Sequence, residues 1–132
     1  MPLRLRQFLV EVLDLLKEDF PAQLERLTKE ADGLTYLQHL DNEEATIIVR
    51  GSSIRIASRA PKKEINIRVR MSRECLFDVL EGRQTLAEAL DAGGLKVFGD
   101  PLTLLRCYAI WERVISLART SPRFYFLTYE LR

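Results

Sequence analysis

Few side chains in this sequence have the chemistry of a catalytic group. His39 is the only histidine, and Cys75 and Cys107 are the only cysteines. A nucleophilic thiol or serine needs an adjacent base, so an enzymatic site would require His39 beside one of the two cysteines. The three residues are far apart in the sequence and lack the spacing of zinc ligands. We therefore expect neither a metal site nor a catalytic site.

The remaining polar motifs have structural explanations. Gly93-Gly94 and Gly99 lack the lysine and the spacing of a phosphate-binding loop. Glu43-Glu44 falls in an expected turn, where carboxylates are more often solvated than paired for acid–base chemistry. Asp100 before Pro101 is typical of a helix N-cap. The chain is thus predicted not to be an enzyme and to need no cofactor.

The composition is that of one globular domain. The 132 residues are 47% hydrophobic and 30% charged, with a formal net charge of +1, so nucleic acid is not an expected partner. Cys75 and Cys107 lie among apolar residues and are expected to be reduced core thiols. No apolar run is long enough to span a membrane and no secretory signal is recognised. We therefore expect a cytoplasmic protein.

Apolar spacing predicts a helical hairpin followed by a sheet. Helical spacing covers Leu3–Glu18 and Ala22–Ala31, and the two helices are separated at Phe20-Pro21. From Leu34 the apolar period changes to two. Short connections favour an antiparallel meander with one buried face, with strands at 34–40, 44–50, 53–59 and 64–71 and turns at 41–42, 51–52 and 60–63.

Basic residues gather on the predicted strands. Solvent exposure of one face of a half-buried sheet explains them, because long basic side chains also protect sheet edges. The alternative is a patch that meets phosphate or an acidic partner. The residues concerned are Arg50, Arg55, Arg59, Lys62, Lys63, Arg68 and Arg70.

Helical spacing returns after Ser72. It predicts helices over 73–81 and 86–92, a short strand over 95–98 and a long helix from Pro101 to about Arg119. The apolar face of the long helix is wider than one stripe, so this helix either covers a core or dimer interface or forms the roof of a cavity. Residues 123–132 alternate well enough for an edge strand, although an extended arm fits equally well.

From Ser72 to Arg106 the sequence resembles the sterol carrier protein family, the domain also called sterol carrier protein type 2. The resemblance rests on an ordered string of four segments. They are the strand-like Glu64–Arg70, the helix-and-glycine segment Leu76–Gly82, the short helix Thr85–Leu90, and Gly94–Pro101 with its glycine–aspartate turn.

This resemblance implies an α+β fold: a five-stranded antiparallel sheet with helices on one face that enclose an apolar tunnel. Members of the family bind sterols, fatty acyl chains, isoprenoids or other lipids, and some serve only as accessory or dimerising domains. The family's ligand-binding positions correspond to Phe77, Leu80, Leu90, Leu105, Tyr108 and Trp111.

The segments outside this core are additions to the family's domain. Within the single domain 1–132 we expect an N-terminal hairpin at 1–33, a sterol-carrier-like core at 34–119 and a C-terminal tail at 120–132. The hairpin could close the tunnel, form a dimer or lie on a membrane surface. The chain ends in Tyr129–Arg132, which is not the peroxisomal address of the animal carriers, so a free-standing bacterial-type relative is favoured.

The leading hypothesis is non-catalytic binding of a lipid, fatty acyl or isoprenoid ligand in the tunnel. The alternative is an interaction or dimerisation module whose core is filled by its own side chains. An enzymatic function would need a substrate held beside Cys75, Cys107 or His39. The expected partner is a hydrophobic small molecule or lipid, and a homodimer or a transient contact with a membrane surface is compatible with the added hairpin.

Overall fold

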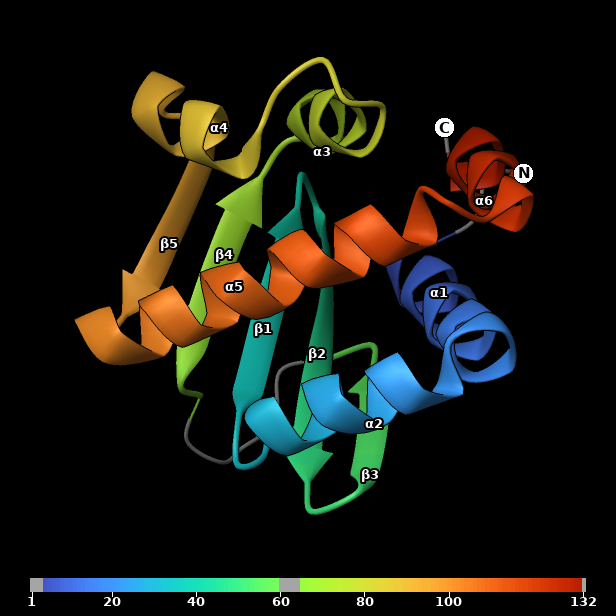
Figure 1. Ribbon diagram of the computed structural model, residues 1–132. Helices are drawn as coiled ribbons and strands as arrows, with labels where there is room; N and C mark the ends of the chain where they lie inside the picture. Colours follow the sequence, from blue (N-terminus) through green and yellow to red (C-terminus); the bar gives the residue numbers. More distant parts are fainter. Residues whose placement is uncertain (1–3, 60–64, 132) are drawn as a thin grey trace.

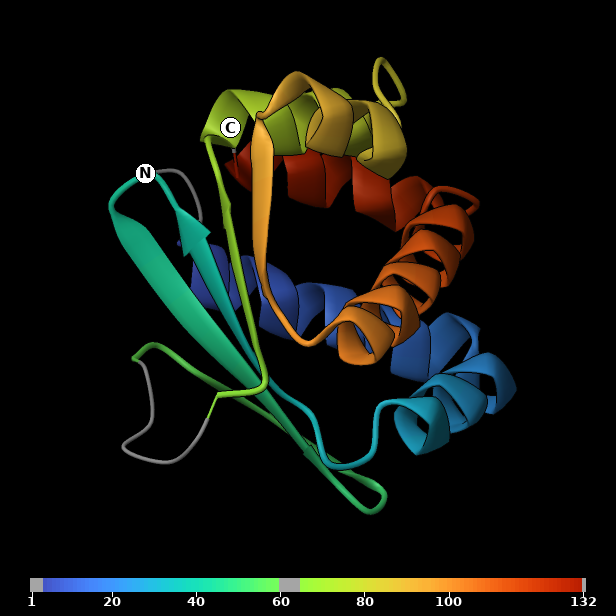
Figure 2. The ribbon, with the colours of Figure 1, turned by 90° about the vertical axis from the view of Figure 1, so that its left-hand side faces the viewer.

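The protein has two layers, with helices packed over one face of a sheet. The computed structural model describes residues 4–59 and 65–131 (Figure 1). Seen edge-on, the helices lie on one side of the sheet (Figure 2). The elements are α1 Leu5–Asp19, α2 Pro21–Glu30, β1 Thr35–Leu40, β2 Glu43–Arg50, β3 Ser53–Ala57, β4 Ile67–Met71, α3 Arg73–Leu80, α4 Leu86–Ala92, β5 Leu95–Gly99, α5 Pro101–Ala118 and α6 Pro122–Leu131.

The predicted α+β class and the five strands are confirmed, but the sheet is mixed rather than wholly antiparallel. Its strand order is β3-β2-β1-β4-β5, and β1 and β4 pair in parallel, with Tyr36 opposite Ile67. The prediction of a simple meander was wrong because β4 follows β3 in the chain but pairs with β1, so that β2 and β1 lie between the two strands and the connection is a crossover. Parallel neighbours require such a crossover connection. The predicted turn at 60–63 lies outside the described residues.

Both ends of the crossover are attached to the sheet. The Thr46 hydroxyl donates to the Arg59 carbonyl at 2.9 Å. Asn66 accepts a hydrogen bond from the Thr35 amide at 2.7 Å and donates its own amide to the Thr35 carbonyl at 3.0 Å. These bonds hold the described ends of the connection against the sheet. The face of the sheet that faces away from the helices is here called the outer face.

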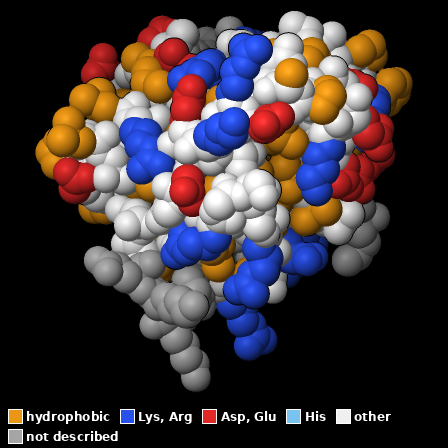
Figure 3. All heavy atoms as spheres, turned by 60° about the horizontal axis from the view of Figure 1, so that its bottom comes forward, with side chains coloured by type: hydrophobic (Ala, Val, Ile, Leu, Met, Phe, Trp, Pro, Cys, Tyr) orange, Lys and Arg blue, Asp and Glu red, His pale blue; other side chains and the backbone are white. Residues whose placement is uncertain are grey.

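The basic side chains of β4 lie on this outer face. Along β4 the buried residues Ile67, Val69 and Met71 alternate with exposed Arg68 and Arg70. Directly opposite them on β5 are Phe98 and Lys96. In Figure 3, basic side chains are interspersed with acidic ones over the upper part of the surface, whereas basic side chains alone gather towards its lower edge. Lys62 and Lys63 lie outside the described residues.

The N-terminal hairpin belongs to the core. Helices α1 and α2 form as predicted and meet at Phe20-Pro21, with Pro21 at the first turn of α2. Leu15 and Leu16 of α1 are buried, and α1 contacts β2, β3, α5 and α6. The hairpin therefore covers the half of the sheet that the other helices leave open, as Figure 1 shows.

The C-terminal tail is a helix, so the prediction of a strand or an extended arm was wrong. Helix α6 buries Phe124, Leu127, Thr128 and Leu131, and the Phe124 ring centroid lies 6.5 Å from that of Phe8 on α1. The spacing of these four residues is that of one face of a helix. The sequence of 123–132 also alternates in the way of a strand, so the two predictions are equally compatible with the local pattern. Packing against α1 decides between the two.

The predicted helix starts in the second half are confirmed by their hydrogen bonds. Ser72 accepts from the Cys75 amide, Asp100 accepts from the Thr103 amide, and Thr85 forms a capping box with Glu88. Gly93 ends α4 with φ of +81°, a left-handed conformation that glycine adopts without a steric cost. Local chemistry thus sets the ends of these helices.

Candidate functional site

An apolar cavity of about 420 Å³ lies between the sheet and the helices. Strands β1, β4 and β5 form its floor, α5 lies opposite, and α1, α3 and α4 close its sides. The lining consists of Leu5, Phe8, Leu9, Tyr36, Gln38, Ile67, Val69, Met71, Leu76, Val79, Leu80, Leu86, Leu90, Leu95, Val97, Pro101, Leu104, Leu105, Cys107, Tyr108, Trp111 and Ile115.

Helix α5 spans this cavity, and most of its large apolar side chains are only partly buried. Only Cys107 and Ala118 on this helix are buried, whereas Leu104, Trp111 and Ile115 are half-buried. A helix packed directly on a sheet buries the apolar stripe that faces it. The partly exposed apolar side chains of α5 therefore fit a helix that covers a cavity. Cover of a cavity is one explanation of the broad apolar face predicted from the sequence, beside cover of a core or of a dimer interface.

The cavity reaches the surface beside the connection from β5 to α5. Leu105 lines the cavity and is also 66% exposed. Two further apolar side chains near this connection project into solvent, Phe98 with 57% and Leu102 with 77% of its surface exposed. We call Phe98, Leu102 and Leu105 the rim. Large exposed apolar side chains gathered at one place commonly mark a binding surface.

The polar side chains at the cavity wall have hydrogen-bond partners. The Tyr36 hydroxyl donates to Gln38 Oε1 at 2.6 Å, and Gln38 Nε2 donates to the His39 carbonyl at 3.0 Å. Burial raises the pKa of Tyr36 well above its ordinary value, so the phenol stays neutral. Among the described residues, no buried side-chain nitrogen or oxygen lacks a partner. The wall therefore suits hydrocarbon.

The residues considered for catalysis are not brought together. Cys107 lines the cavity, and its burial raises the thiol pKa to about 12, so it is not the thiolate that nucleophilic attack needs. His39 alternates with Gln38 along β1 and thus faces away from the cavity, with Nδ1 3.7 Å from the Glu44 carboxylate. The pKa of Cys75 is raised by burial and by the nearby charge of Asp78.

Two further features of the described residues concern metal ions and membranes. Within residues 4–59 and 65–131, no group of three or more histidine, cysteine, aspartate or glutamate side chains is arranged to hold a metal ion. None of the helices described is long and apolar enough to cross a membrane.

Five of the six residues predicted to bind a ligand line the cavity: Leu80, Leu90, Leu105, Tyr108 and Trp111. The sixth, Phe77, does not. It is buried on another side of α3, where the Arg73 guanidinium lies 6.0 Å from its ring centroid. One helical turn separates Leu76 from Val79 and Leu80, so these three share the cavity face and Phe77 lies off it. Ligand binding by these side chains stays a prediction.

Sequence reasoning missed the contributions of β1 and α1. Tyr36 and Gln38 come from β1, and Leu5, Phe8 and Leu9 come from α1. The alternation along β1 was a usable signal for the first two. Nothing local indicated that α1, outside the segment that resembles the carrier family, lies against the same cavity.

Comparisons with known proteins support the fold assignment. No protein-family model matches the sequence, and no curated protein matches it. Among solved structures, sterol carrier protein 2 from Yarrowia lipolytica is 19% identical with a TM-score of 0.60, over 80% of this chain and 84% of that one. The sterol carrier protein domain 2 of Helicoverpa armigera is 13% identical with a TM-score of 0.65, over 83% and 87%.

A third solved structure is a ubiquinone synthesis protein described as UbiJ-SCP2. It is 15% identical with a TM-score of 0.59, and the match covers 76% of this chain and 90% of that chain. At these identities the matches show the fold alone. The chain has the sterol carrier protein 2 fold, and the resemblance predicted from residues 72–106 is confirmed at that level.

Proposed function

We propose that this protein binds a hydrophobic ligand of the lipid, fatty acyl or isoprenoid type in the cavity beneath α5, without catalysing a reaction. The observation that carries the proposal is the position of α5, whose apolar side chains face a hollow of about 420 Å³ instead of a packed core. Apolar area removed from water contributes about 25 cal/mol per Å² before the costs of association. A hydrocarbon ligand would gain this contribution.

The chemistry of the wall supports a ligand whose buried part is hydrocarbon. Tyr36 and Gln38 already hydrogen-bond to each other, and Gln38 also donates to the His39 carbonyl, so the wall offers few polar groups to a buried ligand hydroxyl or carboxylate. The polar group of the ligand therefore stays at the rim, where Leu105 meets solvent. Of the similar structures, one is described as a sterol carrier protein and another as a ubiquinone synthesis protein. Sterols and ubiquinone are both amphipathic molecules of this kind.

The state of the thiols and of His39 supports binding over catalysis. Cys107, which touches the cavity, has a pKa of about 12 and stays a neutral thiol near pH 7. His39, the only histidine in the chain, lies on the outer face. Within the described part of the chain, neither cysteine is therefore paired with the histidine at the cavity.

Native mass spectrometry of freshly purified protein tests the proposal, followed by organic extraction of any bound molecule and titration with a fluorescent acyl probe. We expect a lipid-like adduct, or saturable uptake of the probe that an added fatty acid reverses. A clean mass together with no uptake of probe would show that the cavity is not a lipid site.

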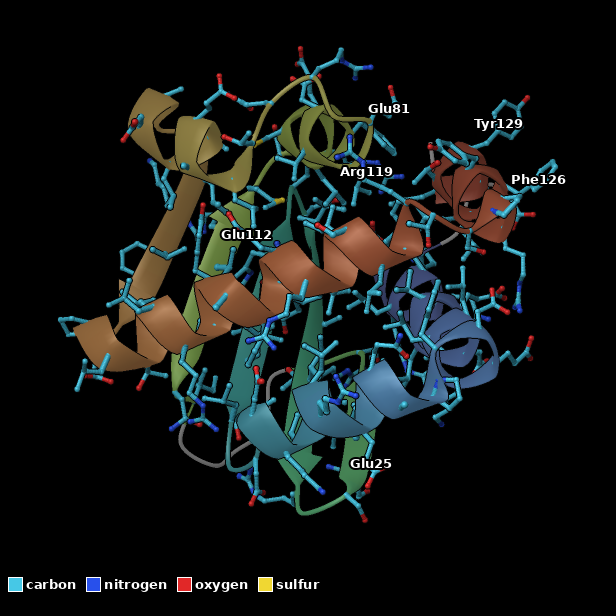
Figure 4. All side chains as sticks on the ribbon, viewed as in Figure 1. Glu25, Glu81, Glu112, Arg119, Phe126 and Tyr129 are labelled. Atoms are coloured by element: carbon cyan, nitrogen blue, oxygen red, sulfur yellow. The ribbon has the colours of Figure 1, made fainter. Side chains whose placement is uncertain are left out.

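One observation favours an interaction module as a second candidate function. Tyr125, Phe126 and Tyr129 project from α6 with most of their surface exposed, and Figure 4 shows Phe126 and Tyr129 pointing away from the rest of the molecule. Exposed aromatic side chains are common in interfaces. A homodimer through α6 predicts a doubled mass in light scattering, which Phe126→Ser and Tyr129→Ser would return to that of a monomer.

We also propose that the rim contacts a membrane surface while the ligand is exchanged. Leu102 and Leu105 are exposed on α5, where Leu105 lines the cavity, and Phe98 is exposed at the end of β5 on the outer face. Arg68 lies directly opposite Phe98, and Arg70 and Lys96 form the next pair of the same face along β4 and β5. Figure 3 shows hydrophobic side chains gathered at the edge of the molecule where α5 begins. Apolar groups that insert at an interface and basic groups that attract anionic lipids are the combination that binds membrane surfaces.

A further inference from the structure

A second apolar cavity lies beside the first, beneath the N-terminal hairpin. Its volume is about 120 Å³, and its walls come from α1, α2, α5 and the half of the sheet that contains β2 and β3. We call it the inner cavity and the larger one the outer cavity. Both lie between the sheet and the helices, on the side of the sheet opposite to its outer face. Leu27 of α2 and Val49 and Ile54 of the sheet line only the inner cavity. The hairpin is therefore what creates this space.

Four residues line both cavities and so stand between them: Leu9, Tyr36, Cys107 and Trp111. The Tyr36 ring comes from the sheet and the Trp111 ring from α5, and their centroids lie 5.5 Å apart with an angle of 48° between the ring planes. Two aromatic rings in contact across the layers form the boundary between the outer and the inner cavity.

The two rings are held differently. Tyr36 is buried and its hydroxyl is bonded to Gln38 at 2.6 Å. Trp111 is half-buried and projects from α5, which has only two buried residues. Tyr36 is thus a fixed support, and the indole of Trp111 is the part of the boundary that fills the space between the cavities.

We propose that Trp111, supported by Tyr36, sets the length of hydrocarbon chain that this protein accommodates. This inference rests on the proposed function. A single-chain lipid enters past the rim, fills the outer cavity with its chain and ends against the indole. The inner cavity lies beyond the indole and takes up no part of the ligand while Trp111 is in place.

A chain-length series measures such a boundary directly. Each buried methylene strengthens binding by about fourfold, so affinity rises with chain length while added carbons enter the cavity. Once the chain meets Trp111, further carbons stay in water at the rim and affinity levels off. The chain length at which affinity levels off is the quantity to compare between variants.

The first experiment measures binding of saturated fatty acids of increasing length to the full chain and to Trp111→Ala. We expect the variant to continue gaining about fourfold per methylene for several carbons past the limit of the unaltered protein. Ile110→Ala is the matched control, because Ile110 lines the inner cavity only; it enlarges that space without opening the boundary and should keep the original limit. Equal limits in the unaltered protein and Trp111→Ala would overturn the proposal.

The second experiment needs no substitution, because Trp111 is the only tryptophan in the chain. Fatty acids brominated at different carbons should quench its fluorescence most strongly when bromine is near the methyl end. Strongest quenching from bromine beside the carboxylate, or quenching independent of position, would show that the chain does not end at Trp111. If neither the unaltered protein nor Trp111→Ala binds any fatty acid, the proposed lipid binding is wrong. If both bind and affinity levels off at the same chain length, only the role of Trp111 as a boundary is wrong.

Discussion

The Tyr36 hydroxyl and the Gln38 amide oxygen lie 2.6 Å apart in a hydrogen bond at the wall of an apolar cavity. Both side chains point to the same side of β1, since they are two residues apart on a strand. This pair places polar atoms in a hydrocarbon environment. Its hydrogen bond also fixes the Tyr36 ring, which contacts the Trp111 ring. Stability and the shape of the cavity are therefore linked at this one pair.

Tyr36→Phe should lower stability with little change in the affinity for an acyl probe. The substitution keeps the ring but leaves Gln38 Oε1 without its donor, and an unsatisfied buried acceptor costs about 1–3 kcal/mol. Urea unfolding measures the loss. Tyr108→Phe is the matched control, because Tyr108 is half-buried and its hydroxyl hydrogen-bonds to Glu112, an exposed carboxylate that water can satisfy after the substitution. Equal stabilities for the two variants would contradict the role given to the Tyr36–Gln38 bond.

Cys107 should make stability fall in alkaline solution. Burial raises its pKa from 9.0 to about 12, so the folded state holds the thiol proton more tightly than the unfolded state does. The contribution of this group to stability is complete below pH 9 and is lost as pH rises towards 12, at up to about 1.4 kcal/mol per pH unit.

Urea unfolding of the unaltered protein and of Cys107→Ala, at pH 8 and at pH 10, measures this effect. The difference between their pH dependences reports the thiol together with its effect on Tyr36, whose pKa is raised by burial and by the charge of Cys107. We expect the unaltered protein to lose more stability between the two pH values. Parallel losses would mean that the Cys107 thiol is accessible to water.

Filling the outer cavity should abolish ligand binding without unfolding the protein. Val97 on β5 lines the cavity and is half-buried, so Val97→Phe places a ring in the space that a ligand would occupy. We expect at least about a tenfold loss of affinity for an acyl probe, corresponding to ~1.4 kcal/mol, and an unfolding midpoint that is not lowered. Ile48→Phe, which places the same ring on the outer face, should bind the probe normally. Unchanged affinity in Val97→Phe would remove the outer cavity as the site.

The rim should bind anionic vesicles in a salt-dependent manner. Leu102→Glu replaces a side chain that is 77% exposed with a charge that repels anionic lipid, so co-sedimentation with phosphatidylglycerol vesicles should decrease several-fold. Raising the salt to 1 M shortens the screening length to about 3 Å and should weaken the basic contribution. Phe126→Ser on α6 serves as the control and should bind vesicles normally. Loss of binding in the control but not in Leu102→Glu would place the membrane contact on α6.

Local sequence predicted most elements of this fold. Pro21, Ser72, Thr85 and Asp100 each occupy the start of a helix for a chemical reason confined to a few neighbouring residues, such as a missing amide hydrogen or a side-chain oxygen that caps the first turn. Apolar alternation likewise predicted β4. The six expected binding residues came from the family resemblance, and helical spacing indicated the inward side of each helix; five of the six line the cavity.

Tertiary structure decided the rest. The parallel pairing of β1 with β4 depends on a crossover that no hairpin signal in the sequence specifies. Residues 122–131 fit two periods, and only packing of Phe124 on Phe8 selects the helix. The cavities are the clearest case: their walls combine residues as far apart in the sequence as Leu9 and Trp111. A local sequence pattern indicates which side of a helix or strand is apolar. The presence and size of a cavity depend on the distances between the helices and strands that pack around it.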